Sequence, residues 1–185
     1  MYRPEQGNTV KFAVEHFCRW HGDRELIIHG DTRYTGHRLN REARAFSQAL
    51  LSHGIGKGDT VALMGTGSCR FYAAYFSVHK FGGVTCNIHV RESPEFIASA
   101  LEQVDAKAVI CSEQLLATAI AGVKLLARNI PIFSLGDTSH KNIAANYADI
   151  IKDFPATEPT IQVSASDTAV IILSSGSTGA PKGII

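Results

Sequence analysis

The chain is 185 residues long, 45% hydrophobic and 19% charged, and it carries a formal net charge of +1. This composition is typical of a globular domain and excludes a disordered chain or one embedded in a membrane. The near balance of charge gives no reason to expect a nucleic acid or an anionic membrane as a partner, and the charged N-terminus predicts no secretory signal.

The first predicted element is a short hairpin over residues 25–34, in which two short runs flank a Gly-Asp turn. Thr35 is then placed to cap a helix over residues 36–53, and Gly54 provides a left-handed end for it. After residue 59 the chain alternates between strand-like and helix-like segments. We predict strands at 60–64, 84–88, 108–111, 131–135 and 168–173, and helices at 70–80, 94–104, 113–128 (capped by Ser112) and 142–151.

The strand-like runs are rich in β-branched residues and lack alternating polar positions. Strands of this kind, separated by helices, predict an α/β fold with a layered, mainly parallel sheet and helices on both faces. We expect a single partial domain over residues 1–185. Its expected parts are an N-terminal segment and hairpin at 1–35, an alternating α/β subdomain at 36–151, a proline-containing connector at 152–167, and a strand with a binding loop at 168–185.

The binding loop is the segment 174–183, which contains three glycines, four hydroxyl side chains and one lysine directly after a buried strand. Glycines let backbone N–H groups converge on an anion, hydroxyls donate to phosphate oxygens or bind magnesium, and Lys182 supplies a compact positive charge. The loop is not a Walker motif, because Pro181 and Gly183 flank the lysine. By composition alone it could be a flexible linker, but the preceding strand and the apolar residues after it favour a phosphate-binding loop.

The ten residues 174–183 closely resemble the signature loop of the ANL superfamily of adenylate-forming enzymes. That superfamily comprises acyl- and aryl-CoA synthetases, the adenylation domains of nonribosomal peptide synthetases, and luciferases. The segments 34–35 and 93–95 also occur in the family's usual order and spacing. The segments 65–67 and 87–90 depart from the family's common pattern, so the subfamily and the acid stay open.

The resemblance implies an ATP-dependent ligase that activates a carboxylic acid. Such enzymes form an acyl-adenylate with release of pyrophosphate and then transfer the acyl group to a thiol, typically that of coenzyme A. The resemblance further implies that the loop holds the phosphates of ATP together with Mg²⁺. The residues expected to contact ATP are Ser174, Ser175, Gly176, Ser177, Thr178, Gly179 and Lys182.

The family's adenosine-binding motifs, most of its acyl pocket and its mobile C-terminal domain with a catalytic lysine would lie beyond Ile185. We therefore expect a truncated N-terminal domain that holds no catalytic residue, is inactive alone, and self-associates through an open sheet edge. Two alternatives stay open: an adenylation domain that loads a carrier protein, and a non-catalytic α/β interaction or regulatory module whose Ser/Gly-rich segment is a terminal tail.

The four cysteines include no Cys-x-x-Cys pair and no histidine at metal-ligand spacing, which favours a reduced, cytoplasmic compartment. Cys86 and Cys111 fall inside apolar runs, where free cysteine behaves as a small buried hydrophobe. His89 follows a strand end, a better place for a ligand than that of His79, although a structural role is favoured for both. We expect Lys57, Asp59 and Lys80 to be solvated, and Phe71, Tyr72, Tyr75 and Phe76 to form a packing face.

Overall fold

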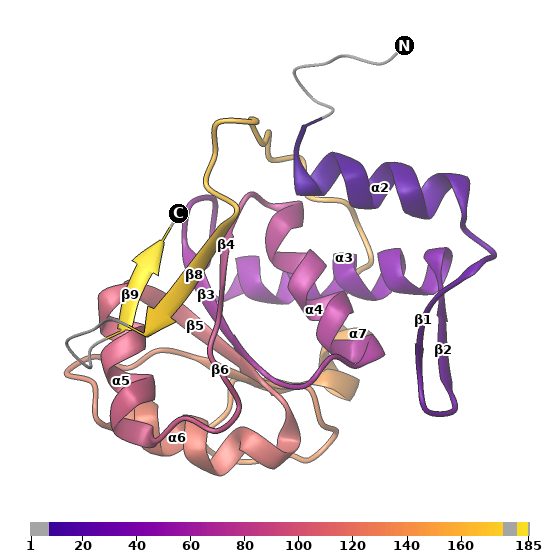
Figure 1. Ribbon diagram of the computed structural model, residues 1–185. Helices are drawn as coiled ribbons and strands as arrows, with labels where there is room; N and C mark the ends of the chain where they lie inside the picture. The colour runs from indigo at the N-terminus through magenta and orange to yellow at the C-terminus, as the bar shows by residue number, and fades with distance from the viewer. Residues whose placement is uncertain (1–7, 176–180, 185) are drawn as a thin grey trace.

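The computed structural model describes residues 8–175 and 181–184. Its main sheet contains seven strands: β3 (Thr60–Met64), β4 (Val84–Asn87), β5 (Ala106–Cys111), β6 (Ile132–Ser134), β7 (Ala145–Asn146), β8 (Val170–Ser175) and β9 (Pro181–Ile184). Their order across the sheet is β7-β6-β5-β3-β4-β8-β9 (Figure 1). Neighbours pair in parallel from β7 to β8, and β8 pairs with β9 antiparallel. The predicted α/β class with a mainly parallel sheet is confirmed.

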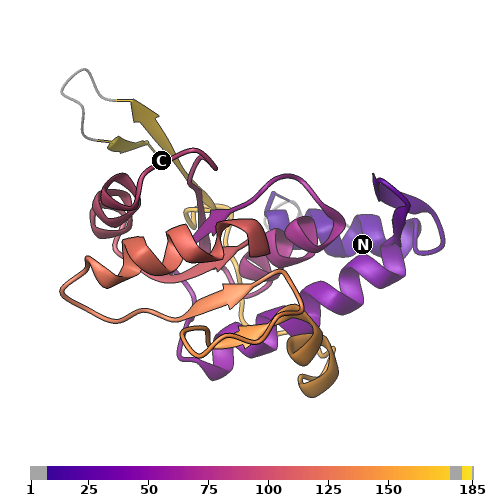
Figure 2. The same ribbon diagram turned by 90° about the horizontal axis from the view of Figure 1, so that it is seen from below.

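Helices cover both faces of this sheet. On one face lie α3 (Gly36–Ser52), α4 (Cys69–Lys80) and α7 (Tyr147–Asp153), and on the other lie α5 (Pro94–Gln103) and α6 (Leu116–Lys124) (Figures 1 and 2). The central strand β3 divides its side chains between the two layers, since successive side chains of a strand point to opposite faces. Val61 and Leu63 pack under α3 and α4, whereas Ala62 and Met64 pack under α5 and α6.

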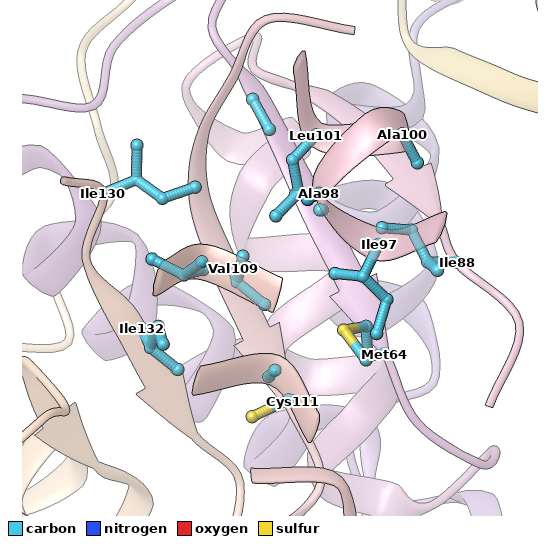
Figure 3. Packing of buried hydrophobic residues seen from close by; sticks show 14 of the residues in the cluster. Met64, Ile88, Ile97, Ala98, Ala100, Leu101, Val109, Cys111, Ile130 and Ile132 are labelled. Carbon is cyan, nitrogen blue, oxygen red and sulfur yellow. The ribbon is translucent and has the colours of Figure 1, made fainter. Parts of the chain in front are cut away.

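The layer under α5 and α6 is a continuous apolar core (Figure 3). Ile97 and Leu101 of α5 are fully buried against Val109 and Cys111 of β5. The helices approach each other closely at Gly122 of α6, where an added Cβ would lie 2.7 Å from Cγ2 of Ile97. Here the lack of a side chain sets the distance between two helices.

Side-chain caps fix where several helices begin, among them the predicted cap at Thr35. The hydroxyl of Thr35 accepts a hydrogen bond from the backbone N–H of Arg38 at 3.3 Å, and that of Ser93 accepts one from Phe96 at 3.3 Å. Gly54 follows α3 with φ of +79°, which confirms the predicted left-handed end. The hairpin of β1 (Glu25–His29) and β2 (Thr32–Thr35) is likewise confirmed.

The structure corrects the sequence prediction at three helices. A helix over Val10–Trp20, α2, was not predicted; it packs on α3 and α4 through Val14 and Cys18. The predicted helix at 113–128 is a 3₁₀ turn over Glu113–Leu115 followed by the shorter α6, and Ser112 makes no side-chain cap. The predicted helix at 142–151 is wrong in its first half, because residues 145–146 pair with β6 instead and Asn146 caps α7.

Between α7 and β8 the chain runs from residue 154 to residue 169 without a helix or strand. This segment, called the connector below, crosses back over the layer of α2, α3 and α4. It also corrects the prediction that Lys80 is solvated. Lys80, the last residue of α4, is 0% exposed, and its Nζ lies 2.9 Å from Oε2 of Glu158 in the connector.

Candidate functional site

The predicted phosphate-binding segment begins inside β8 and ends inside β9. Ser174 and Lys182 face each other across the two strands, and Oγ of Ser174 donates a hydrogen bond to the carbonyl of Lys182 at 3.3 Å. The backbone of Ser175 pairs with that of Pro181. The segment therefore connects the strands of a hairpin, which the sequence analysis did not predict. The other proposed contacts, Gly176, Ser177, Thr178 and Gly179, lie outside the described residues.

The hairpin presents two different faces. Ile171 and Leu173 of β8 pack on the core under α5, and an added Cβ at Gly183 would lie 3.0 Å from Cγ2 of Ile171. Because side chains alternate along a strand, Ser174 and Lys182 share the opposite face. The Lys182 side chain is exposed there. The ammonium group of Lys182 is therefore accessible to an anion on this face of the hairpin.

The neighbouring strands end at the same edge of the sheet. The segments that follow β3 and β4 line a hollow of about 360 Å³, with Gly65, Gly67 and Tyr72 on one side and Asn87 and His89 on the other. The loop after β3 is packed tightly, since an added Cβ at Gly65 would lie 2.5 Å from Oγ of Ser112. The sequence analysis identified both segments as departures from the family pattern and named His89, in the second segment, as better placed for a ligand than His79.

The topology explains why a ligand site belongs at this edge. β3 lies between β4 and β5, and the helix that follows β3 covers one face whereas the helix that follows β4 covers the other. A crevice opens where the crossover helices leave to opposite faces, and open α/β sheets bind ligands outside the carboxyl ends of strands at this position. The hollow occupies that crevice, and β8 ends on the other side of β4.

The histidines differ in their surroundings. His79 is buried, its Nε2 lies 3.4 Å from Oγ1 of Thr85, and burial lowers its pKa to about 4. It is an interior packing residue, as expected. His89 is exposed beside the hollow, and its Nδ1 accepts the backbone N–H of Arg91 at 3.3 Å. The described residues contain no group of three or more potential metal-ligating His, Cys, Asp or Glu side chains.

Most of the residues predicted to be solvated or to pack in the interior lie where the sequence predicts. Lys57 is exposed, as expected, and pairs with Asp167 at 2.7 Å. Asp59 is half-buried and its Oδ2 accepts the N–H of Gly56 at 2.7 Å, so it serves as a turn residue. The aromatic side chains of α4 pack as predicted, except that Tyr72 is 40% exposed. All four cysteines are buried and free: Cys18, Cys69, Cys86 and Cys111.

Comparison with known families identifies the chain. A family model described as AMP-binding enzyme matches residues 14–185. The chain belongs to the AMP-binding enzyme family. The resemblance to the ANL superfamily is thereby confirmed, and the match extends over nearly the whole chain and includes the candidate loop.

Curated members of the AMP-binding family resemble the chain at moderate identity. A medium/long-chain-fatty-acid–CoA ligase, FadD6 of Mycobacterium tuberculosis, is 28% identical over 185 residues, which is 99% of this chain and 30% of FadD6. The acetate–CoA ligase CCL3 of Humulus lupulus is 31% identical over 120 residues, 65% of this chain and 21% of that protein. The chain therefore spans about a third or less of the length of these relatives.

Solved structures of this family share the fold. The crystal structure of the anthranilate CoA ligase AuaEII with anthranoyl-AMP superposes with a TM-score of 0.88 at 22% identity, covering 95% of this chain and 34% of that one. The N-terminal domain of FACL13 from Mycobacterium tuberculosis gives a TM-score of 0.79 at 22% identity, covering 95% and 43%. Among the described helices, none has the length and apolar character needed to cross a membrane.

Proposed function

We propose that the chain is the ATP-phosphate-binding part of an AMP-forming acid–thiol ligase in the cytoplasm. The whole ligase would join a small-molecule carboxylic acid, short or long, to the α-phosphate of ATP, release pyrophosphate, and pass the acyl group to coenzyme A. The observation that carries the proposal is the position of the signature loop. It follows a parallel strand of the sheet, beside the crevice where the crossover helices diverge.

Each candidate residue has a defined task in this proposal. Lys182 compensates charge on the β- and γ-phosphates, because its exposed side chain lies on the open face of the hairpin. Ser175, Ser177 and Thr178 offer hydroxyl donors, and Ser174 joins them when its hydroxyl releases the carbonyl of Lys182, while Gly176 and Gly179 let backbone N–H groups approach the phosphates. Positioned donors of this kind stabilise the charge that develops on departing pyrophosphate.

The described residues suit Mg²⁺ that arrives with the nucleotide better than a resident metal ion. They contain no cluster of carboxylate or imidazole ligands, and the candidate loop supplies hydroxyl groups and a cation. Magnesium commonly retains waters and binds proteins through few groups plus substrate phosphates. When bound, Mg²⁺ would neutralise phosphate charge; the chain's own residues would orient the phosphates.

The proposal is tested by titrating ATP with Mg²⁺ into the chain and into Lys182→Ala by calorimetry. Loss of a charge-assisted contact to phosphate should weaken binding by about tenfold or more. Lys124→Ala is the matched control, because Lys124 is an exposed lysine of α6 far along the sheet from β9. Equal ATP affinity in wild type and Lys182→Ala would refute the assignment of the loop.

We further propose that the 185-residue chain does not form acyl-adenylates alone, since it spans about a third of its relatives' length. The measurement is acid-dependent exchange of labelled pyrophosphate into ATP, with a panel of short, long and aromatic acids. Exchange above background with any acid would show that the chain holds a complete adenylating site.

A further inference from the structure

The connector is held to the helical layer by a buried cluster of charges. Oε2 of Glu158 receives hydrogen bonds from Nζ of Lys80 at 2.9 Å and from Nε of Arg44 at 2.7 Å. Lys80 is 0% exposed, so bulk water cannot take the place of Glu158 as its hydrogen-bond partner. Around Glu158, Lys11 donates to the carbonyls of residues 159 and 161, and Gln48 donates to that of residue 157.

A second carboxyl group lies in the same cluster. Glu15 of α2 places Oε1 3.8 Å from Nζ of Lys80, the same atom that lies 2.9 Å from Oε2 of Glu158. The Oε1 atoms of both glutamates are buried and have no hydrogen-bond partner among the described residues; Nζ of Lys11 lies 3.9 Å from Oε1 of Glu158. A hydrogen bond between two carboxyl groups exists only when one of them carries a proton. A proton on one of the two glutamates would supply the donor that both buried oxygens lack.

Each element around the two glutamates contributes charged or titratable groups. α2 contributes Lys11 and Cys18 beside Glu15, α3 contributes Arg44, and α4 contributes Lys80. Further along the connector, Lys57 pairs with Asp167, and His79 of α4 lies at the adjoining hollow. Lys80 and Arg44 both bond directly to Glu158, whereas Glu15 has only the longer approach of Lys80.

We propose that Glu15 and Glu158 share one proton and that this proton is a pH-dependent latch, which holds the connector on α2, α3 and α4 and loosens it when Glu15 ionises. Two carboxylates in contact repel each other, and Lys80 already bonds to Glu158. A hollow of about 550 Å³, lined by Glu15, Glu158 and connector residues 159–164, gives water a route to the ionised group.

The titration properties agree with this geometry. Burial, and then the hydrogen bond to Glu158, raise the pKa of Glu15 from 4.5 to about 7. For Glu158, burial acts to raise the pKa, but the hydrogen bonds from Glu15 and Lys80 outweigh it and lower the pKa to about 2. Because the folded pKa of Glu15 lies above its unfolded value, the latch is complete below pH 4.5 and is lost as pH rises through 7.

The latch acts where the connector enters the main sheet. The connector ends at residue 169, whose carbonyl accepts the backbone N–H of Thr85 at 3.0 Å, and β8 begins at the next residue. A connector released from α2 and α4 would free the start of β8 to shift along β4. This proposal does not rest on the proposed ligase function, since the groups that form the latch lie outside the loop.

The test is a nuclear magnetic resonance titration of the 185-residue chain from pH 5 to pH 9. We expect the side-chain carboxyl carbon of Glu15 to titrate near pH 7 instead of 4.5. The backbone amides of residues 157–163 should follow the same midpoint, and their heteronuclear Overhauser effects should fall above it. A Glu15 midpoint near 4.5, or connector amides that do not respond between pH 6 and 8, would overturn the latch.

Glu15→Gln separates this titration from that of the histidines, which ionise in the same range. Glutamine donates a hydrogen bond at every pH, so the connector of this variant should keep its low-pH spectrum at pH 8. Glu102→Gln, an exposed change on α5, should titrate as wild type. A connector that still loosens in Glu15→Gln contradicts the proposal, and the wild-type carboxyl titration decides the matter if this variant does not fold.

Discussion

Replacement of Lys80 by methionine should destabilise the protein strongly, although Lys80 lies at the end of a helix. Methionine retains most of the apolar stem, so the change removes chiefly the charge. Breaking a buried ion pair by removing one partner costs about 3–5 kcal/mol. Arg44 still donates to the same oxygen of Glu158 at 2.7 Å, which places the expected loss at the lower end, about 3 kcal/mol.

The assay is urea unfolding at pH 6 followed by far-ultraviolet circular dichroism, with thermal unfolding as a second measure. For a chain of this size each kcal/mol moves the thermal midpoint by roughly 2–4 °C, so Lys80→Met should lower it by about 6–12 °C. Lys124→Met controls for lysine loss at an exposed site. A Lys80→Met loss below about 1 kcal/mol would show that the buried pair contributes little net stability and would refute this reasoning.

Two further predictions concern the core and its pH dependence. Gly122→Ala places a Cβ 2.7 Å from Cγ2 of Ile97, and we expect a net loss of about 1–2 kcal/mol in urea unfolding despite the better helix propensity of alanine. Ile97→Leu removes the β-branch at this contact and should restore part of the free energy of unfolding that Gly122→Ala loses. An unchanged urea midpoint for Gly122→Ala would contradict the close approach of the two helices. Burial lowers the pKa of His79 from 6.5 to about 4, so its contribution to stability is present above pH 6.5 and is lost as pH falls through 4. This pKa difference of about 2.5 units corresponds to about 3 kcal/mol. Between pH 7 and pH 4 the wild type should therefore lose about 3 kcal/mol of unfolding free energy relative to His79→Gln. Parallel pH profiles of the two unfolding free energies would contradict this prediction.

The sequence is informative where local signals and burial agree. The strand at residues 60–64 is buried on both faces, so its apolar run identifies it without ambiguity. The helix after Thr35 has a side-chain cap at its start and a glycine of positive φ at its end, and its bounds were predicted to within a residue. The fold class follows from the alternation of such elements.

The sequence does not predict structure that depends on contacts between distant segments. α2 owes its place to packing of Val14 and Cys18 on helices that come later in the chain. Lys80 at a helix end is ordinarily solvated, but Glu158 arrives 78 residues later and covers it. Residues 142–146 were assigned to a helix because strand pairing with β6 is not visible in local spacing.

The candidate site was found by composition and its position in the sheet, not by its backbone conformation. The order of glycines, hydroxyls and Lys182 after an apolar strand was sufficient to locate the loop. The return of the chain as β9 was missed, because proline at position 181 argues against a strand. An edge strand tolerates proline, and β9 is the last described strand on its side of the sheet.

The position of β8 has a consequence for how the protein assembles. β8 pairs with β4, although 84 residues lie between the paired residues Thr85 and Val170. During synthesis, β3 to β7 can associate before β8 leaves the ribosome, and β4 then presents an unpaired edge. β8 must find that edge from a distance, so the step that places the candidate loop is also the one most exposed to mispairing between nascent chains.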